Sequence, residues 1–222
     1  MPGKKLKKIL LIVLLSGFIN IYSAELSGGL SFGYNGGPGL MINGMAGNFA
    51  QNFPFKARLA FGYASITNPG KALGARRIFI NNATNGKPEK QGRVWDIRMD
   101  MFYRTAIFGI SDTYIFGGPR YTMFTGNFNF VDGNEDFDVT SNQWGWGLGL
   151  SKFFRMNKNF NLVFETGLEY FFESVLSGHD TSYSPDGEHV NPREDYSYKD
   201  ADNAVNQPAL GLRLLMGINY AF

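Results

Sequence analysis

Cysteine is absent from this chain of 222 residues. The protein therefore cannot form disulfides, bind a metal through thiolates, use a cysteine nucleophile or carry a lipid on cysteine. Histidine is scarce as well, because only His179 and His189 occur. The fold must be stabilised by packing and hydrogen bonds alone.

Long hydrophobic runs are also lacking. An apolar run begins at Ile9 and, even extended to Tyr22, covers 14 residues, fewer than the roughly 20 that a membrane-spanning helix needs. Lysines precede this run at positions 4, 5, 7 and 8, and Tyr22-Ser23-Ala24 follows it, which is the pattern of a secretory signal peptide. We expect cleavage after Ala24, so that residues 1–24 are a signal peptide and residues 25–222 form one domain. Because Tyr22 is unusual three places before a cut, another cleavage position and an uncleaved anchor stay open.

Strong net charge is missing too. Removing residues 1–24 takes away four lysines and no acidic residue, which moves the formal charge from +2 to −2. This balance gives no reason to expect a nucleic-acid partner. Phosphate-binding loops, dinucleotide fingerprints and zinc-ligand spacings are absent as well. We therefore expect no cofactor, no metal and no enzymatic activity.

The sequence does contain segments in which apolar and polar residues alternate. Near the C-terminus every second residue is apolar or aromatic, and these residues are Leu210, Leu212, Leu214, Met216, Ile218, Tyr220 and Phe222. The residues between them are mostly small or polar and include Arg213. A period of two predicts a β-strand with one apolar face.

The same period predicts eight strands. We place them at residues 26–35, 39–49, 55–66, 93–107, 113–128, 139–154, 160–173 and 207–222. Residues 39–49 give no clear apolar face. The connections alternate, with short turns after the second, fourth and sixth strands and polar loops at 67–92, 129–138 and 174–206. This arrangement is typical of a closed, antiparallel, up-and-down transmembrane β-barrel with short periplasmic turns and long extracellular loops.

A soluble β-sandwich or a lipocalin-like carrier stays open as an alternative, because strands of those proteins also alternate. The predicted strands are long for a sandwich and suit a tilted membrane strand. In a carrier, the apolar faces would have to turn inward around a ligand.

The chain resembles the small eight-stranded outer-membrane barrels of the OmpA/OmpX-like superfamily. The resemblance rests on the leader, the alternating strands, the glycine-rich run 145–150, the stretch 116–121 and the terminal Tyr220-Ala221-Phe222. It implies a monomer in the Gram-negative cell outer membrane, in contact with the lipid bilayer and lipopolysaccharide. It also implies that Tyr220 and Phe222 act as the signal for the barrel assembly machinery. The resemblance implies no particular ligand.

Charged residues occupy the non-apolar face of several predicted strands. Those expected to project into the lumen are Lys56, Arg58, Asp96, Arg98, Asp100, Arg104, Arg120, Glu165, Glu169 and Arg213. An eight-stranded barrel is nearly filled by its own side chains, and buried ions must be paired. We therefore predict a lumen closed by salt bridges, with a narrow small-solute channel as the alternative.

The predicted loops carry three weaker patterns. In the loop at 174–206, both histidines lie near serines and acids, which leaves a lipid-modifying Ser/His/acid site open as a less favoured hypothesis. The acids of this loop also raise the possibility of calcium. The loop at 67–92 is basic around the apolar Ile78-Phe79-Ile80 and is a hypothetical contact for phosphates or an unknown surface ligand. A solvated loop, or a hairpin that extends the barrel, is the favoured interpretation there.

Aromatic residues are predicted at the two membrane interfaces, where such barrels carry aromatic girdles. The candidates are Trp95, Trp144, Trp146, Tyr103, Tyr114, Tyr170 and Tyr220. Taken together, the sequence predicts an outer-membrane protein with a structural or surface-interaction role, such as adhesion or envelope integrity.

Overall fold

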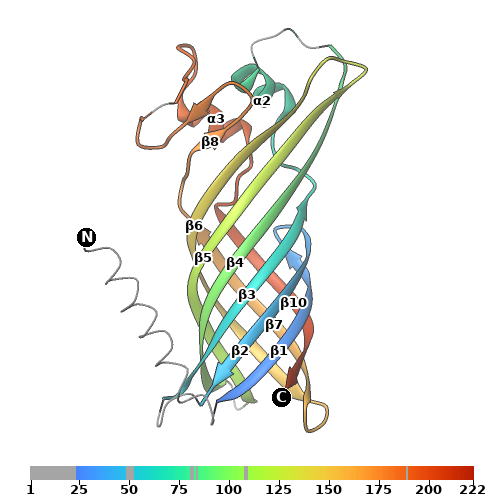
Figure 1. The fold of residues 1–222 in the computed structure, drawn as a ribbon, viewed down its shortest axis with the longest axis vertical. Coiled ribbons are helices and arrows are strands. Elements are labelled where there is room, and N and C mark those ends of the chain that lie inside the picture. The colour runs from blue at the N-terminus through green and yellow to red at the C-terminus, as the bar shows by residue number, and fades with distance from the viewer. Residues whose placement is uncertain (1–23, 49–52, 81–82, 84, 108–109, 189) are drawn as a thin grey trace, which may run out of the picture.

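Eight long strands close into one antiparallel barrel in a computed structural model, which describes residues 24–48, 53–80, 83, 85–107, 110–188 and 190–222 (Figure 1). The barrel strands are β1 (Glu25–Asn35), β2 (Pro38–Gly47), β3 (Phe55–Ile66), β4 (Lys87–Ile107), β5 (Ile110–Val131), β6 (Asp136–Arg155), β7 (Phe160–Phe171) and β10 (Leu210–Ala221). Each strand pairs with its neighbours in the chain, and β10 closes the barrel against β1. The predicted fold class is confirmed. The predicted leader falls almost entirely outside the described residues, and its cleavage stays a prediction.

The two ends of the barrel differ. The connections β2–β3, β4–β5 and β6–β7 lie at one end together with the C-terminus, and we call this the short-turn end (Figure 1). The connections β3–β4, β5–β6 and β7–β10 lie at the other, which we call the long-loop end. The connection β1–β2 is also at the long-loop end but consists of Gly36 and Gly37 alone. Gly36 has φ +74°, a value that glycine adopts without strain.

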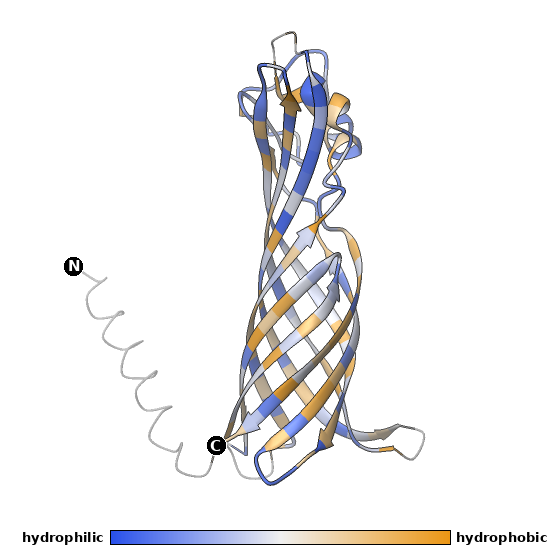
Figure 2. Ribbon diagram, turned by 90° about the vertical axis from the view of Figure 1, so that its right-hand side faces the viewer, coloured by the Kyte–Doolittle hydropathy of each residue, from blue (hydrophilic) through white to orange (hydrophobic). Residues whose placement is uncertain are grey.

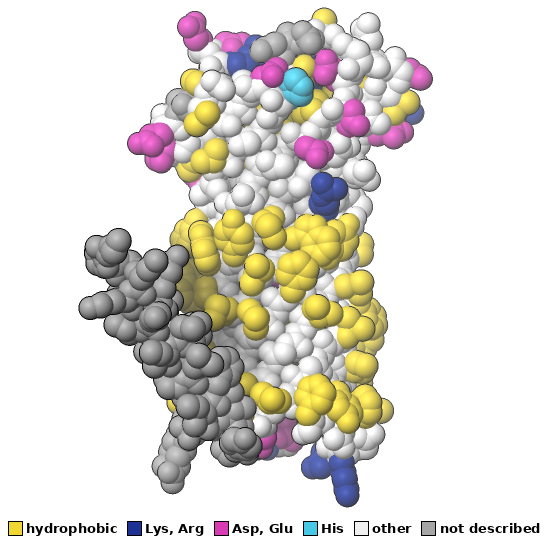
Figure 3. Space-filling view, viewed as in Figure 1, with side chains coloured by type: hydrophobic (Ala, Val, Ile, Leu, Met, Phe, Trp, Pro, Cys, Tyr) yellow, Lys and Arg dark blue, Asp and Glu magenta, His cyan; other side chains and the backbone are white. Residues whose placement is uncertain are grey.

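Apolar side chains cover the outside of the lower barrel. In Figure 3 they form a band, with charged side chains gathered above it, and Figure 2 shows the polar residues concentrated toward the long-loop end. The ambiguous second strand follows the same rule, because Leu40 and Ile42 are each 57% exposed while Met41 is buried. A belt of exposed leucine and phenylalanine side chains would be unfavourable in water, so the belt is the surface that contacts hydrocarbon. None of the helices among the described residues is long and apolar enough to cross a membrane.

Strands β4, β5 and β6 rise beyond this belt, which corrects the prediction of a polar loop at 129–138. Of the loop predicted at 67–92, residues 87–92 belong to β4, as expected of a hairpin that extends the barrel. Asn129 pairs with Asp136, and a turn at 132–135 joins the two strands. The polar residues of this region form the outer face of the sheet, while Phe128, Phe130 and Phe137 are buried on its inner face. Phenylalanine burial therefore turns an Asn- and Asp-rich segment into a strand.

The two long connections fold together against that inner face, and we call this assembly the loop unit. It contains α2 (Ala72–Phe79), β8 (Leu176–Ser177), β9 (Ser182–Tyr183) and α3 (Tyr198–Ala204). Its apolar core includes Ile78, Phe79 and Ile80, so the patch expected in a basic loop is buried. The connections are joined through an isolated bridge between Gly70 and Val205.

A capping box begins α3. The Ser197 hydroxyl accepts a hydrogen bond from the backbone N–H of Asp200, and the Asp200 carboxylate accepts one from the backbone N–H of Ser197 at 2.9 Å. The Ser197 hydroxyl also donates to this carboxylate at 2.6 Å. These hydrogen bonds, that from the hydroxyl above all, lower the pKa of the Asp200 carboxyl below its ordinary value. Reciprocal capping of this kind satisfies donors that a helix N-terminus otherwise leaves free.

Candidate functional site: the barrel lumen

Eight charged side chains are buried inside the barrel. They are Arg58, Asp96, Arg98, Asp100, Arg120, Glu165, Glu169 and Arg213, with relative exposures between 0% and 6%. Strict alternation places them there, because the neighbours of each along its strand face the hydrocarbon. Four guanidinium groups face four carboxylates, so the buried cluster has no net formal charge.

Six of these residues form a closed ring of ion pairs. Arg58 donates to Asp100 at 2.6 Å and to Glu165, and Asp100 is also 2.7 Å from Arg120. Glu165 is 3.5 Å from Arg213. Glu169 completes the ring by pairing with both Arg120 and Arg213. The ring spans strands β3, β4, β5, β7 and β10, so it ties together opposite walls of the barrel.

Glu169 is the hub of the network. Its Oε1 atom accepts hydrogen bonds from Arg98 at 2.8 Å, Arg213 at 3.0 Å and Arg120 at 3.1 Å. Arg98 also pairs with Asp96 on its own strand. Taking ions out of water costs several kcal/mol each unless they are paired, and here each buried charge has at least one partner of opposite sign. The network therefore replaces an apolar core.

An aromatic layer lies below the ring, toward the short-turn end. The rings of Phe102 and Phe116 stack with centroids 5.0 Å apart. Arg58 lies 4.6 Å from the centroid of Phe102, and Arg213 lies 5.0 Å from that of Phe116. Guanidinium groups are attracted to aromatic faces at such distances. The two phenylalanines and the ring together fill the middle of the lumen.

Lys56 and Arg104, also expected in the lumen network, lie at the short-turn mouth of the barrel. Their side chains are 37% and 63% exposed, and they pair with Glu25 at 3.3 Å and with Asp112 respectively. Both line a cavity of about 440 Å³ at this mouth. Both residues alternate with outward-facing neighbours, as the sequence predicted, and so lie on the inner face of their strands. They are too near the end of the barrel to reach the buried cluster.

A second cavity, of about 310 Å³, lies on the long-loop side of the ring and is lined in part by Asp96, Arg98 and Gln207. Close to its wall, buried side-chain oxygens of Thr122 and Gln143 have no hydrogen-bond partner within the described part of the chain. The lumen thus has a vestibule at each end, and the ring and the aromatic layer lie between them.

The predicted interface aromatics lie on the outer wall. Trp95, Trp144, Trp146 and Tyr170 are 39%, 62%, 58% and 54% exposed, toward the long-loop end of the belt. Tyr220 and Phe222 are 38% and 83% exposed at the short-turn end. Tyr114, in contrast, was wrongly assigned to a girdle. It faces the lumen, where its ring packs against those of Phe102 and Phe153.

The loop histidines do not assemble a triad in the described residues. His179 pairs with Asp180 at 2.9 Å on the surface, Ser182 bonds to Ser177, and Ser184 bonds to Asp186. His189 lies outside the described residues. Among the residues that the structure describes, no three histidine or acidic side chains come together as metal ligands.

Comparison with solved structures bears on the architecture. A crystal structure of a major outer membrane protein from Thermus thermophilus aligns with 90% of this chain and 100% of that chain, at 24% sequence identity and a TM-score of 0.72. The chain has the fold of an eight-stranded outer-membrane β-barrel.

More distant outer-membrane barrels align as well. The attachment invasion locus protein Ail of Yersinia pestis aligns over 90% of this chain and 97% of its own, with 12% identity and a TM-score of 0.47. Neisserial surface protein A aligns over 90% and 96%, with 10% identity and a TM-score of 0.38. No family model matches the sequence, and no curated protein does.

Two features of the outer-membrane barrel escaped the sequence reasoning. The stacking of Phe102 on Phe116 was missed, although both residues lie on the same inward face of their strands as the buried charged residues. Lys152, between Leu150 and Phe154 on the outward face of β6, is a cation in the apolar belt. An interruption of the apolar period by lysine was the signal that could have found it.

Proposed function

We propose that this barrel is a closed anchor that presents the loop unit at the cell surface for interaction with another molecule. In the proposed orientation the long-loop end of the barrel faces the outside of the cell, and the short-turn end faces the periplasm. The observation that carries the proposal is the apolar core of the loop unit, in which Phe79, Tyr183 and Phe128 are all fully buried. Solvated loops need no such core, whereas a defined binding surface requires a fixed backbone.

The proposal predicts that attachment depends on the folded loop unit. Phe79→Asp buries a carboxylate in its core and should unfold it while leaving the membrane barrel closed. Leu73→Asp is the matched control, because Leu73 is on the same helix and 56% exposed. Cells making the wild type or Leu73→Asp should attach to surfaces or aggregate more than cells lacking the protein, and cells with Phe79→Asp should not.

Detergent sensitivity of the same cells separates attachment from envelope integrity. If the wild type confers no attachment but its loss sensitises cells to detergent, the protein is structural and the surface-interaction proposal is wrong. Equal attachment by Phe79→Asp and wild type would also contradict it.

A narrow channel is the second candidate, favoured by the two vestibules. The closed-anchor proposal predicts no single-channel events in planar bilayers for the wild type. Conductance of the wild type that changes in Glu165→Gln or Arg213→Ala would instead support passage through the ring.

A further inference from the structure

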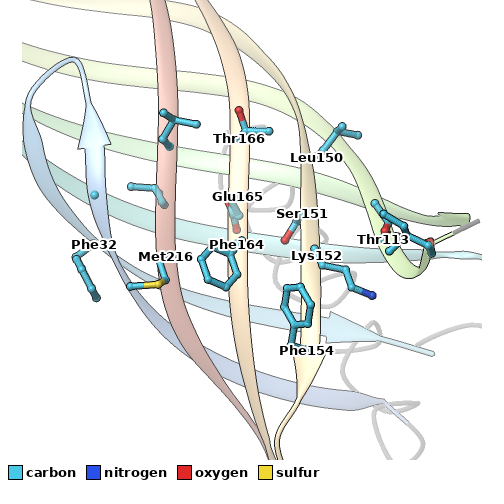
Figure 4. Close-up of a pocket in the computed structure, with 14 residues that line it drawn as sticks. Phe32, Thr113, Leu150, Ser151, Lys152, Phe154, Phe164, Glu165, Thr166 and Met216 are labelled. Carbon is cyan, nitrogen blue, oxygen red and sulfur yellow. Dashed lines mark hydrogen bonds between the residues drawn. The ribbon is translucent and has the colours of Figure 1, made fainter. Parts of the chain in front are cut away.

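An apolar groove runs across the outer wall of the barrel over β1, β10, β7 and β6 and reaches the start of β5, and we call it the wall groove (Figure 4). Its volume is about 740 Å³. The side chains that frame it include Phe32, Met216, Phe164, Leu150 and Phe154. It is a hollow in the surface that contacts hydrocarbon, so its occupant must be apolar over most of its length.

Strand register explains the hollow. Phe32, Met216, Phe164 and Lys152 form one continuous row of paired residues across the four strands. In the next row toward the long-loop end, Thr166 lies between two leucines, Leu214 and Leu150. Threonine is smaller than its neighbours, and the wall is therefore depressed at its position.

Lys152 supplies a charge at the edge of the wall groove. Its ammonium donates to the backbone carbonyl of Ser111 near the short-turn end and lies 5.2 Å from the ring centroid of Phe154. A cation on the lipid-facing surface is costly unless it reaches the interface or finds a partner. Within the described ranges no carboxylate pairs with Lys152, and an ammonium has three donors. At least one donor is therefore available to an external anion.

We propose that the wall groove binds an anionic phospholipid, with an acyl chain along Phe164 and Thr166 and the phosphate on Lys152. The short-turn end also carries the exposed Arg155, the last residue of β6, which adds positive potential for an anionic headgroup. In the orientation proposed above, this lipid belongs to the inner leaflet. A phospholipid fits better than a protein partner, because one molecule then satisfies both the apolar hollow and the cation.

Native mass spectrometry of the protein purified in mild detergent tests the site. We expect the delipidated wild type to bind one phosphatidylglycerol more tightly than phosphatidylcholine. Lys152→Gln should weaken phosphatidylglycerol binding by about tenfold, the effect of losing one charge-assisted hydrogen bond. It should weaken phosphatidylcholine binding less, because the choline cation offsets the charge of that lipid's phosphate, and so reduce the preference. Thr166→Phe fills the hollow and should weaken binding of both lipids.

Two control variants keep the test specific. Gly44→Phe fills another outer-wall groove, of about 370 Å³, whose lining among the described residues has no charged side chain. Lys158→Gln removes a cation from the same end of the barrel without touching the wall groove. Both should bind phosphatidylglycerol as the wild type does.

Unchanged binding in Lys152→Gln, or loss of the lipid preference in Lys158→Gln instead, would overturn the proposal. A faster-running unboiled band in detergent gels verifies that each variant is folded. If Thr166→Phe fails this check, Lys152→Gln alone decides. These lipid titrations depend neither on attachment nor on conductance, so their failure would leave the closed-anchor function standing, and the reverse also holds.

Discussion

Glu169 places three guanidinium groups on a single carboxylate oxygen in the middle of the barrel. Substitution of this one side chain therefore removes several ion pairs at once. Because Arg98, Arg120 and Arg213 come from three different strands, the loss of Glu169 affects several walls at once. Without Glu169, the three remaining carboxylates of the cluster, Asp96, Asp100 and Glu165, would face four guanidinium groups.

We expect Glu169→Ala to destabilise the barrel by roughly 3–5 kcal/mol, because it leaves an uncompensated positive charge in the buried cluster. The measurement is urea unfolding in detergent micelles, followed by tryptophan fluorescence. Glu25→Gln is the control, since its exposed pair with Lys56 is worth at most about 1 kcal/mol. Equal unfolding midpoints for the two variants would mean that the ring does not stabilise the barrel.

Alternation in the sequence predicted which side chains face inward, and all eight buried ions were among the ten expected. What it could not predict was depth along the barrel axis. Lys56 and Arg58 share a face, yet one lies at the mouth and the other in the ring. Depth depends on strand tilt and register, which arise from pairing between segments far apart in the chain.

At the scale of elements, the capping box of α3 should make this helix sensitive to acid. The charged Asp200 carboxylate accepts the capping hydrogen bonds, and its pKa is lowered by them. A lowered folded-state pKa means that its contribution to stability is complete above the unfolded value of about 3.9 and is lost as the pH falls through the folded value.

Hydrogen exchange of the α3 amides checks this expectation. Ser197→Ala should cost about 1 kcal/mol, as the loss of an N-cap does, and should remove most of the acid-dependent loss of protection. Lys199→Gln, within the same helix, should preserve it. Acid sensitivity that is identical in Ser197→Ala and wild type would show that another group controls α3.

The elements that sequence reasoning missed share a physical cause. The extension of β5 and β6 contains a legible alternation at Phe128, Phe130 and Phe137, but its Asn, Asp and Gly content favoured a loop. Helices α2 and α3 are short, and short helices are marginal without tertiary contacts. Their apolar faces are buried only because two connections, one before β4 and one after β7, fold together.

At the scale of the whole molecule, the natural absence of cysteine makes the orientation directly measurable. Asn134→Cys places one thiol in the β5–β6 turn, and Asn157→Cys places one in the β6–β7 turn at the opposite end. A membrane-impermeant maleimide added to intact cells should label the first and not the second. After the cells are lysed, both should react. Labelling of Asn157→Cys in intact cells, without that of Asn134→Cys, would invert the proposed orientation.

The seam between β1 and β10 has a consequence for how the protein is made. It pairs Ser27 with Ala221 and Asn35 with Arg213. One edge of the first strand therefore stays unpaired until the last strand of the chain is available. Unpaired strand edges recruit other chains, and contacts between distant segments form slowly. A nascent or truncated chain therefore exposes two unpaired strand edges and an apolar surface. We expect chaperones to be needed to prevent its aggregation until the last strand pairs with the first.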